Sequence, residues 1–387
     1  MRSPLFLLII GLIMLFYALL NYYVGLRGWQ FLGRYIPFLS SKAYWLVFWL
    51  IAMSYFLGRL GGAFLPGSFV QGLKVIGSYW LAALFYMILI WAAVDVLRLL
   101  DRLVDFSARL QIGGLPQAAV GGLVFMAVLG IMVYGSWNAR NPQIVEYQIN
   151  IPKKAGNYDT LSAVLVSDIH LGSIVDNRRL NEMIDMINQL EPELVLLAGD
   201  IIDEDVEFFV EQQMAESFRR LTPKLGTYAV LGNHEYIGGN AEDAVHYLQE
   251  AGIHVLIDDY VLVEDSFYIV GRDDRAGTRF TGQGRKSLTD IMQGVDNGRP
   301  IILLDHQPTH LEEAREAGVD LQLSGHTHRG QLFPNHLITQ KIFEIDWGYL
   351  LKGDLQVIVS TGYGTWGPPI RIGNKPELVY IKFQFGP

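Results

Sequence analysis

The sequence predicts a membrane-anchored α/β protein, with four membrane-spanning helices followed by a domain of alternating strands and helices. Three observations support this prediction: the long apolar runs all lie within residues 1–140, the nine histidines all lie from His170 onward, and the charge balance changes sign between the two parts. Residues 1–140 carry ten Lys or Arg and three Asp or Glu, whereas the remainder carries 20 and 36. We therefore predict a transmembrane helical domain at 1–140 and an α/β domain at 141–387.

Composition excludes several classes of function. The chain has no cysteine, which excludes thiol catalysis, thiolate metal ligands and disulfides. Its net charge is −9, and the acidic α/β part shows no stripe of basic residues. Binding to a phosphate backbone needs clustered Lys and Arg, so nucleic acid is not an expected partner.

Four apolar runs are long enough to cross a bilayer, which takes roughly 20 helical residues. Aromatic residues such as Tyr22, Trp80 and Trp137 lie near their ends, as expected at the level of the lipid headgroups. The first run could instead be a cleaved signal peptide, but it is too long, lacks a small-residue cleavage pattern and precedes three further runs. The predicted spans are Pro4–Tyr23, Ala43–Leu65, Val75–Leu99 and Leu115–Trp137.

The third span is predicted to continue as an amphipathic helix that ends at Gly113, Gly114 and Pro116. Asp95 in this span could belong to an ion pathway. Arg98 lies one turn away, however, which favours a paired structural carboxylate. The predicted spans hold no other acid and no histidine, so a transporter is disfavoured. Charged residues that share one face of the extended helix are Asp95, Arg98, Asp101, Arg102, Asp105 and Arg109.

Loop charges predict the orientation of the chain. Four spans place the N-terminus and the α/β domain on the same side of the membrane. The opposite loops carry Arg27, Arg34, Lys42, Arg98, Arg102 and Arg109. The domain side carries Arg2, Arg59, Lys74 and Arg140, with Lys153 and Lys154 further out. The positive-inside rule therefore favours an integral membrane protein with an extracytoplasmic α/β domain.

From about Asn141, short apolar runs alternate with amphipathic stretches such as Arg179–Leu190 and Ala241–Ala251. This alternation predicts a largely parallel sheet with helices on both faces. Ligands of such sheets bind just beyond the carboxyl ends of the strands. The predicted strands are Leu161–Val166, Leu194–Leu197, Tyr228–Leu231, Ile301–Leu304 and Leu321–Leu323.

Five polar blocks follow these strands directly. Residues two apart on an extended segment point the same way, so Asp168 and His170 face one cleft, as do His326 and His328. Carboxylate, imidazole and amide donors without sulfur suit manganese, iron or zinc better than calcium or a soft metal. The donors are too many for one ion but would suit two ions that share a carboxylate. The blocks are Asp168-Ile169-His170, Gly199-Asp200, Gly232-Asn233-His234-Glu235, Asp305-His306 and Gly325-His326-Thr327-His328.

In this order, over roughly 161–330, the blocks resemble the calcineurin-like metallophosphoesterase superfamily. The resemblance implies that 141–387 is a catalytic domain with an α-β-β-α arrangement, a β-sandwich covered by helices. It also implies two divalent metal ions and hydrolysis of a phosphoester or pyrophosphate bond by a hydroxide that bridges them. By the family pattern, the first ion binds Asp168, His170 and His328, the second binds Asn233, His306 and His326, Asp200 bridges both, and His234 is the catalytic histidine.

Single residues of the blocks have simpler explanations. A lone Asp after a strand is usually a turn or a helix cap, and a lone histidine is usually a partly exposed polar residue, so the metal prediction rests on the whole set. Glu235 and Asp305 could orient ligand histidines or could make ordinary hydrogen bonds. Residues that match no block are interpreted as structural: Asp203, His246, His254, His310 and His336.

The segment from Ser360 to Gly367, with Arg371 and Pro376-Glu377, resembles bacterial membrane-associated phosphohydrolases, which include the UDP-diacylglucosamine pyrophosphatases. This implies a bacterial cell membrane and a phospholipid or a nucleotide-linked lipid as substrate. Arg329 departs from many members of that subgroup, which have glycine after the last histidine. Arginines that could grip a phosphate bidentately, or lie solvated at the surface, are Arg272, Arg275, Arg329 and Arg371. Tyr363 and Trp366 could contact a lipid or a base, or could pack the loop.

The leading hypothesis is a membrane-associated, two-metal phosphohydrolase. The alternative is a metal-dependent binding or sensing module on a membrane scaffold, without turnover. Degraded blocks would favour that alternative, but every expected donor and His234 are present.

Overall fold

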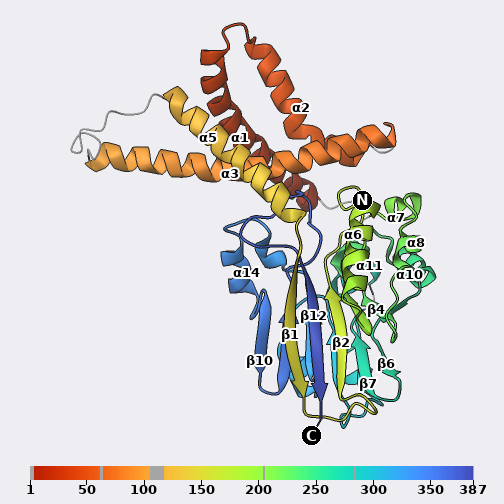
Figure 1. Ribbon diagram of the computed structural model, residues 1–387. Helices are drawn as coiled ribbons and strands as arrows, with labels where there is room; N and C mark the ends of the chain where they lie inside the picture. Colours follow the sequence, from red (N-terminus) through yellow and green to blue (C-terminus); the bar gives the residue numbers. More distant parts are fainter. Residues whose placement is uncertain (1–3, 62–63, 105–116, 204, 283, 387) are drawn as a thin grey trace. The chain divides into compact units, whose positions relative to one another are not determined.

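The structure, a computed structural model, describes residues 4–61, 64–104, 117–203, 205–282 and 284–386 (Figure 1). Contacts between residues divide the chain into two compact units, Met1–Gly135 and Ser136–Pro387.

The first unit consists of long apolar helices, each of which is long and apolar enough to cross a membrane. The four predicted spans are thereby confirmed. The first helix is longer than predicted, since it continues from Tyr23 to Tyr35. The third helix ends at Val104 among the described residues, so the predicted extension through Asp105 and Arg109 lies outside them. The helices are α1 (Pro4–Tyr35), α2 (Ser41–Leu60), α3 (Gly67–Val104) and α5 (Gln117–Ala139).

Asp95 is a paired carboxylate, as predicted, but its main partners are distant in sequence. Its Oδ2 accepts hydrogen bonds from Tyr23 Oη at 2.7 Å and Arg27 Nη2 at 2.5 Å. Arg98 Nη1 lies further away, 3.7 Å from Asp95 Oδ1. The Arg27 guanidinium also lies 5.0 Å from the centre of the Trp91 ring, a cation–π distance. The pair therefore joins α1 to α3 and has a structural role.

The second unit contains two six-stranded sheets with helices around them (Figure 1). The first sheet has the order β1-β12-β2-β3-β4-β5, and the second has the order β10-β11-β9-β8-β7-β6. In that order, the strands of the first sheet are Gln143–Ile151, Glu377–Phe385, Thr160–Val166, Leu194–Ala198, Thr227–Val230 and Ile253–Val255. Those of the second are Gly348–Lys352, Leu355–Val359, Leu321–Ser324, Ile301–Leu304, Phe267–Gly271 and Asp259–Val263.

The two sheets confirm the fold that the family resemblance implied and correct the pattern-based prediction of one largely parallel sheet. All five predicted strands are present, and they pair in parallel within each sheet. The strands that the sequence analysis did not predict lie towards the edges of the sheets, where β12, β6 and β10 each make an antiparallel pair. Several of these strands are partly exposed, for example β1, and lack the continuous apolar run by which buried strands are recognised.

Three apolar layers hold the sandwich together. Side chains of both sheets, such as Leu165, Leu196, Ile302 and Leu323, meet in the central layer. Helix α6 packs on the first sheet through Leu180, Met183, Ile184 and Ile187, whose spacing places them on one helical face. A third layer covers the outer face of the second sheet. The helices of this unit are α6 (Asn177–Gln189), α7 (Glu207–Glu211), α8 (Met214–Phe218), α9 (Asn233–Ile237), α10 (Ala241–Glu250), α11 (Arg275–Thr281), α12 (Leu288–Ile291), α13 (Leu311–Glu316) and α14 (His336–Ile342).

Candidate dinuclear metal centre

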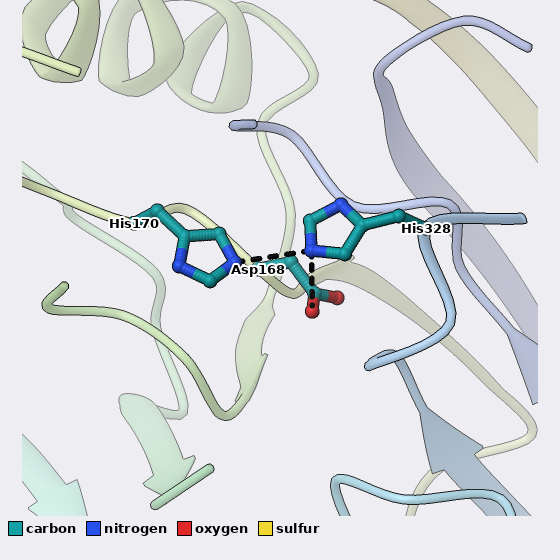
Figure 2. A group of neighbouring side chains, drawn as sticks. All are labelled: Asp168, His170 and His328. Atoms are coloured by element: carbon teal, nitrogen blue, oxygen red, sulfur yellow. Dashed lines mark hydrogen bonds and ion pairs between the residues drawn. The ribbon is translucent and has the colours of Figure 1, made fainter. Parts of the chain in front are cut away.

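The first donor group consists of Asp168, His170 and His328, which come from the ends of β2 and β9 (Figure 2). His170 Nε2 lies 3.0 Å from His328 Nε2, and His328 Nε2 lies 3.3 Å from Asp168 Oδ1. All three residues are buried. The Asp168 carboxylate is held in place by Ser167 Oγ at 2.6 Å and by the backbone N–H of His326 at 3.0 Å.

The second donor group consists of Asp200, His306 and His326. Asn233, which the family pattern also assigns to the second ion, is the first residue of α9 and directly precedes His234. His306 Nε2 lies 3.2 Å from Asp200 Oδ2. His306 Nδ1 lies 2.7 Å from the Ala198 carbonyl oxygen. Because a carbonyl only accepts, Nδ1 carries a proton, and Nε2 is the ring nitrogen that faces the site.

Asp200 links the two groups. Its Oδ2 also lies 3.8 Å from His170 Nε2, a donor of the first group. Its Oδ1 accepts a hydrogen bond from the backbone N–H of His234 at 2.8 Å. The structure therefore brings together Asp168, His170, Asp200, His306, His326 and His328 in two adjoining groups.

Divalent ions fit these residues. Among the described residues, the His306 Nε2 nitrogen and the Asn233 Oδ1 oxygen are buried polar atoms without a hydrogen-bond partner, a state that normally costs free energy. The two facing nitrogens of His170 and His328 are 3.0 Å apart, which is the separation of two nitrogens bound side by side to one ion at about 2.1 Å each. Each observation is explained when the ring nitrogens and the amide oxygen are metal ligands.

Electrostatics differ between the donor residues. Burial opposes ionisation of Asp200, but His306, His170 and His234 outweigh it and hold the pKa of Asp200 well below its usual value. Although burial acts in the opposite direction, the carboxylate of Asp200 raises the pKa of His306 well above its usual value. Burial, His170 and Arg371 together lower the pKa of His328 well below its usual value.

Glycines in the blocks permit this close packing. A Cβ at Gly232 would overlap the Asp200 carboxylate, and a Cβ at Gly325 would overlap Asp168 and Ser167. The donors themselves have an unusual backbone. Positive φ angles occur at Asp168 (50°), His170 (52°), Asp200 (51°), His326 (69°) and His328 (46°), a left-handed region that non-glycine residues enter uncommonly.

His234 lies beside both donor groups and pairs with an acid that sequence reasoning missed. Its ring centre is 4.6 Å from that of His170, and its Nδ1 lies 2.8 Å from Asp203 Oδ1. Burial would lower the pKa of His234, but Asp203 and Asp200 raise it to about 9. Asp203 was interpreted as structural, and this contact corrects that interpretation. The available signal was a second carboxylate three residues after Asp200 in the same loop.

Glu235 and Asp305, left open by the sequence, make hydrogen bonds and ion pairs away from the ligand rings. Glu235 accepts hydrogen bonds from the backbone N–H groups of Ile201 (2.7 Å), Ile202 (2.9 Å) and Gly232 (2.7 Å). It thereby ties the loop after β3 to the loop after β4. Asp305 pairs with Arg285 Nη1 at 3.1 Å.

Two of the predicted substrate-binding arginines are buried, which contradicts the prediction. Arg371 is fully buried, donates to Gly364 O at 2.6 Å, and places Nη2 3.3 Å from His328 Nδ1. Arg272 is 4% exposed and pairs with Glu313 at 2.9 Å. A buried guanidinium has to be paired within the protein, so neither is presented to a substrate. Arg329 follows the donor His328 in sequence, and its guanidinium lies 4.2 Å from the centre of the Trp347 ring.

The remaining candidates divide between packing and exposure. Tyr363 is buried and donates to Arg179 O at 3.1 Å, so it packs the loop. Trp366 is 57% exposed, and its ring centre lies 6.3 Å from that of His234. The histidines outside the blocks belong to neither donor group: His246, His254, His310 and His336.

The sandwich fold and the paired donor groups at its strand ends define a metal-dependent phosphohydrolase. Residues 161–330 match the family described as calcineurin-like phosphoesterase. The chain is 31% identical to a "Transmembrane protein with metallophosphoesterase domain" of Danio rerio, over 86% of this chain and 80% of that one. It is 34% identical to an "Uncharacterized metallophosphoesterase" of Aquifex aeolicus, over 67% of this chain and 98% of that one. A metallophosphoesterase of Campylobacter jejuni matches 98% of this chain and 99% of its own length at 25% identity.

The chain therefore belongs to the calcineurin-like metallophosphoesterase family. Family membership and the two donor groups identify a centre for divalent metal ions. The four apolar helices and the transmembrane relatives identify a membrane protein.

Proposed function

We propose that this protein hydrolyses a phosphoester or pyrophosphate bond of a lipid-linked, membrane-associated substrate, with two manganese, iron or zinc ions. Asp168, His170 and His328 would hold one ion, and Asn233, His306 and His326 would hold the other. Asp200 would be shared. The observation that carries this proposal is the position of Asp200, whose one carboxylate lies within 4 Å of a histidine from each group.

Two divalent ions, when bound, would supply Lewis acidity and an activated water for in-line attack on phosphorus. The protein itself supplies a proton donor. His234 has a raised pKa and is therefore protonated at neutral pH, which suits it to stabilise the transition state or to protonate the leaving oxygen. Asp203 orients the ring through Nδ1 and leaves Nε2 for this work. Asp200 fixes the His234 backbone.

Substrate recognition is proposed to involve Arg329. Its guanidinium follows the last ligand histidine directly and is planar, which suits bidentate contact with a phosphate. The lipid part of the proposal is supported by the four apolar helices, which confine the enzyme to the membrane and raise its encounter with lipids. A nucleotide-linked lipid and a phospholipid both satisfy this chemistry.

The membrane is proposed to be a bacterial cell membrane with the catalytic unit on its extracytoplasmic side. The resemblance of the C-terminal segment supports the first statement, and the distribution of Lys and Arg supports the second. Protease digestion of intact cells tests the orientation, since an extracytoplasmic unit is cleaved before the cells are lysed.

The decisive test uses detergent-solubilised full-length protein loaded with Mn or Zn. We expect cleavage of an aryl phosphodiester and of members of a panel of phospholipids, nucleotide-linked lipids and soluble phosphoesters. Asp200→Ala and His234→Ala should abolish it, while His310→Ala, which changes an exposed histidine outside the site, should not. Equal activity in the first two variants would refute the assignment. Two bound ions without hydrolysis of any substrate would instead support a binding or sensing module.

A further inference from the structure

An exposed apolar strip runs along α14. Phe333, Leu337, Ile338 and Ile342 are 52%, 54%, 58% and 67% exposed, and we name these four residues the α14 patch. Leu337, Ile338 and Ile342 lie on α14, where the four-residue spacing of Ile338 and Ile342 places these two side chains on one face. Phe333 lies just before the helix begins. A contiguous exposed apolar patch marks a site of interaction.

Hydrogen bonds link the helix that carries the patch to the loop that carries His326 and His328. Thr339, which also lies on α14, donates its hydroxyl to Asp346 Oδ2 at 2.6 Å. The Asp346 carbonyl in turn accepts from Thr327 Oγ1 at 2.6 Å, and Thr327 stands between the ligands His326 and His328. The Phe343 ring, one residue after α14, lies 5.9 Å from the His326 ring. Helix α14 (Figure 1) is therefore linked to the loop that carries His326 and His328.

Within the second unit, hydrogen bonds also link the patch to the segment that directly follows Gly135. That span runs to Ala139, and Asn138, which belongs to the second unit, donates to Asn374 O at 2.7 Å. The neighbouring Ile372 pairs with Leu332 and accepts from the Phe333 N–H at 2.9 Å. Two hydrogen-bonded steps thus connect the end of a membrane span to the first residue of the α14 patch.

We propose that the α14 patch inserts into the headgroup region of the bilayer and holds the metal centre against the lipid surface, where it takes its substrate. Membrane-surface segments combine such apolar residues with basic ones, and the exposed Lys341 on α14 suits anionic headgroups. A second protein copy is a poorer occupant, because four half-exposed side chains fall well short of the roughly 800 Å² that each partner buries in a stable complex. The use of the patch to obtain a lipid substrate rests on the proposed function.

The absence of cysteine from the chain allows a direct test. Ile338→Cys is labelled with a fluorescent probe in the full-length protein, in nanodiscs that contain lipids with a spin-label quencher just below the headgroup. The control is Asp354→Cys, an exposed residue in the turn before β11, at the other end of the second sheet from the metal centre. We expect strong quenching at position 338 and none at position 354. Equal quenching at both positions, or none at position 338, would overturn the proposal.

A second test measures turnover. In Leu337→Ser/Ile338→Ser/Ile342→Ser, we expect KM for a lipid phosphoester in vesicles to rise at least about tenfold, while cleavage of a soluble aryl phosphodiester is unchanged. An unchanged KM for the lipid, or an equal loss on both substrates, contradicts the use of the patch for lipid substrates. If the unmodified enzyme cleaves neither substrate, the proposed function fails, and the quenching experiment still decides whether the patch contacts lipid.

Discussion

The two donor groups of the metal centre contain the same kinds of side chain but are supported differently. In the second group, His306 is fixed by the Ala198 carbonyl on one side and by Asp200 on the other. In the first group, His328 is backed by the buried guanidinium of Arg371. The carboxylate of Asp200 raises the pKa of His306, whereas burial, His170 and Arg371 lower the pKa of His328.

This difference determines which ligand competes for protons. Before metal binds, the raised pKa of His306 keeps its ring protonated at neutral pH, whereas the lowered pKa of His328 keeps its ring neutral. A ligand imidazole has to be neutral to bind an ion. His328 is therefore ready to accept metal, and His306 must first release a proton.

The largest expected effect comes from removing one ligand of each group in turn. His306→Ala and His328→Ala should each retain about one ion per chain and lose activity on the order of 10³-fold, because several kcal/mol of Lewis-acid stabilisation are removed. Metal analysis after gel filtration, with kcat/KM on a soluble phosphodiester, measures both. Loss of both ions from either variant would show that the groups do not bind independently, and His310→Ala serves as the unaffected control.

A smaller effect is expected from Asp203→Asn, which keeps the size of the side chain and removes the charge that faces His234. Activity that needs protonated His234 falls as pH rises through the pKa of that ring, which Asp203 helps to raise to about 9. Without this charge, the fall should begin at lower pH, towards the ordinary value of about 6.5, and kcat/KM at pH 8 should drop about 10- to 100-fold.

Profiles of kcat/KM against pH for the two proteins test this prediction. The two proteins differ only in the charge at position 203, so the difference between the profiles is the quantity to compare. Superimposable basic limbs would show that Asp203 only packs the loop.

The smallest effect, a difference of about one proton, sharpens the comparison directly. In His328→Ala the second donor group stays intact, and in His306→Ala the first donor group stays intact. At pH 7, ion binding to His328→Ala should release about one proton more than binding to His306→Ala, because only the former retains a protonated His306. Calorimetric titration in two buffers of different ionisation enthalpy measures this release. Equal proton release from the two variants would mean that the surroundings of His306 and His328 do not give the two rings different pKa values.

Sequence patterns were sufficient to predict the buried strands and the polar blocks that follow them. The strands Leu161–Val166 and Ile301–Leu304 were recognised because buried strands form continuous apolar runs, and the blocks were recognised because parallel strands end at one edge. Arg371 was misassigned because an arginine carries no sequence mark of burial, and only the folded loop shows the carbonyls around it. Asp95 was paired with its neighbour Arg98 because the contact with Arg27 depends on how α1 and α3 pack.

The left-handed backbone at the ligand positions has a consequence for the stability of the protein. Asp168, Asp200 and His328 adopt φ angles near 50°, which glycine would adopt without penalty and which cost other residues roughly 1–3 kcal/mol each. The active enzyme therefore keeps residues that its own backbone disfavours. Glycine at these positions would relieve the strain but would remove a donor side chain, so the strained backbone is retained together with the donors that it supports.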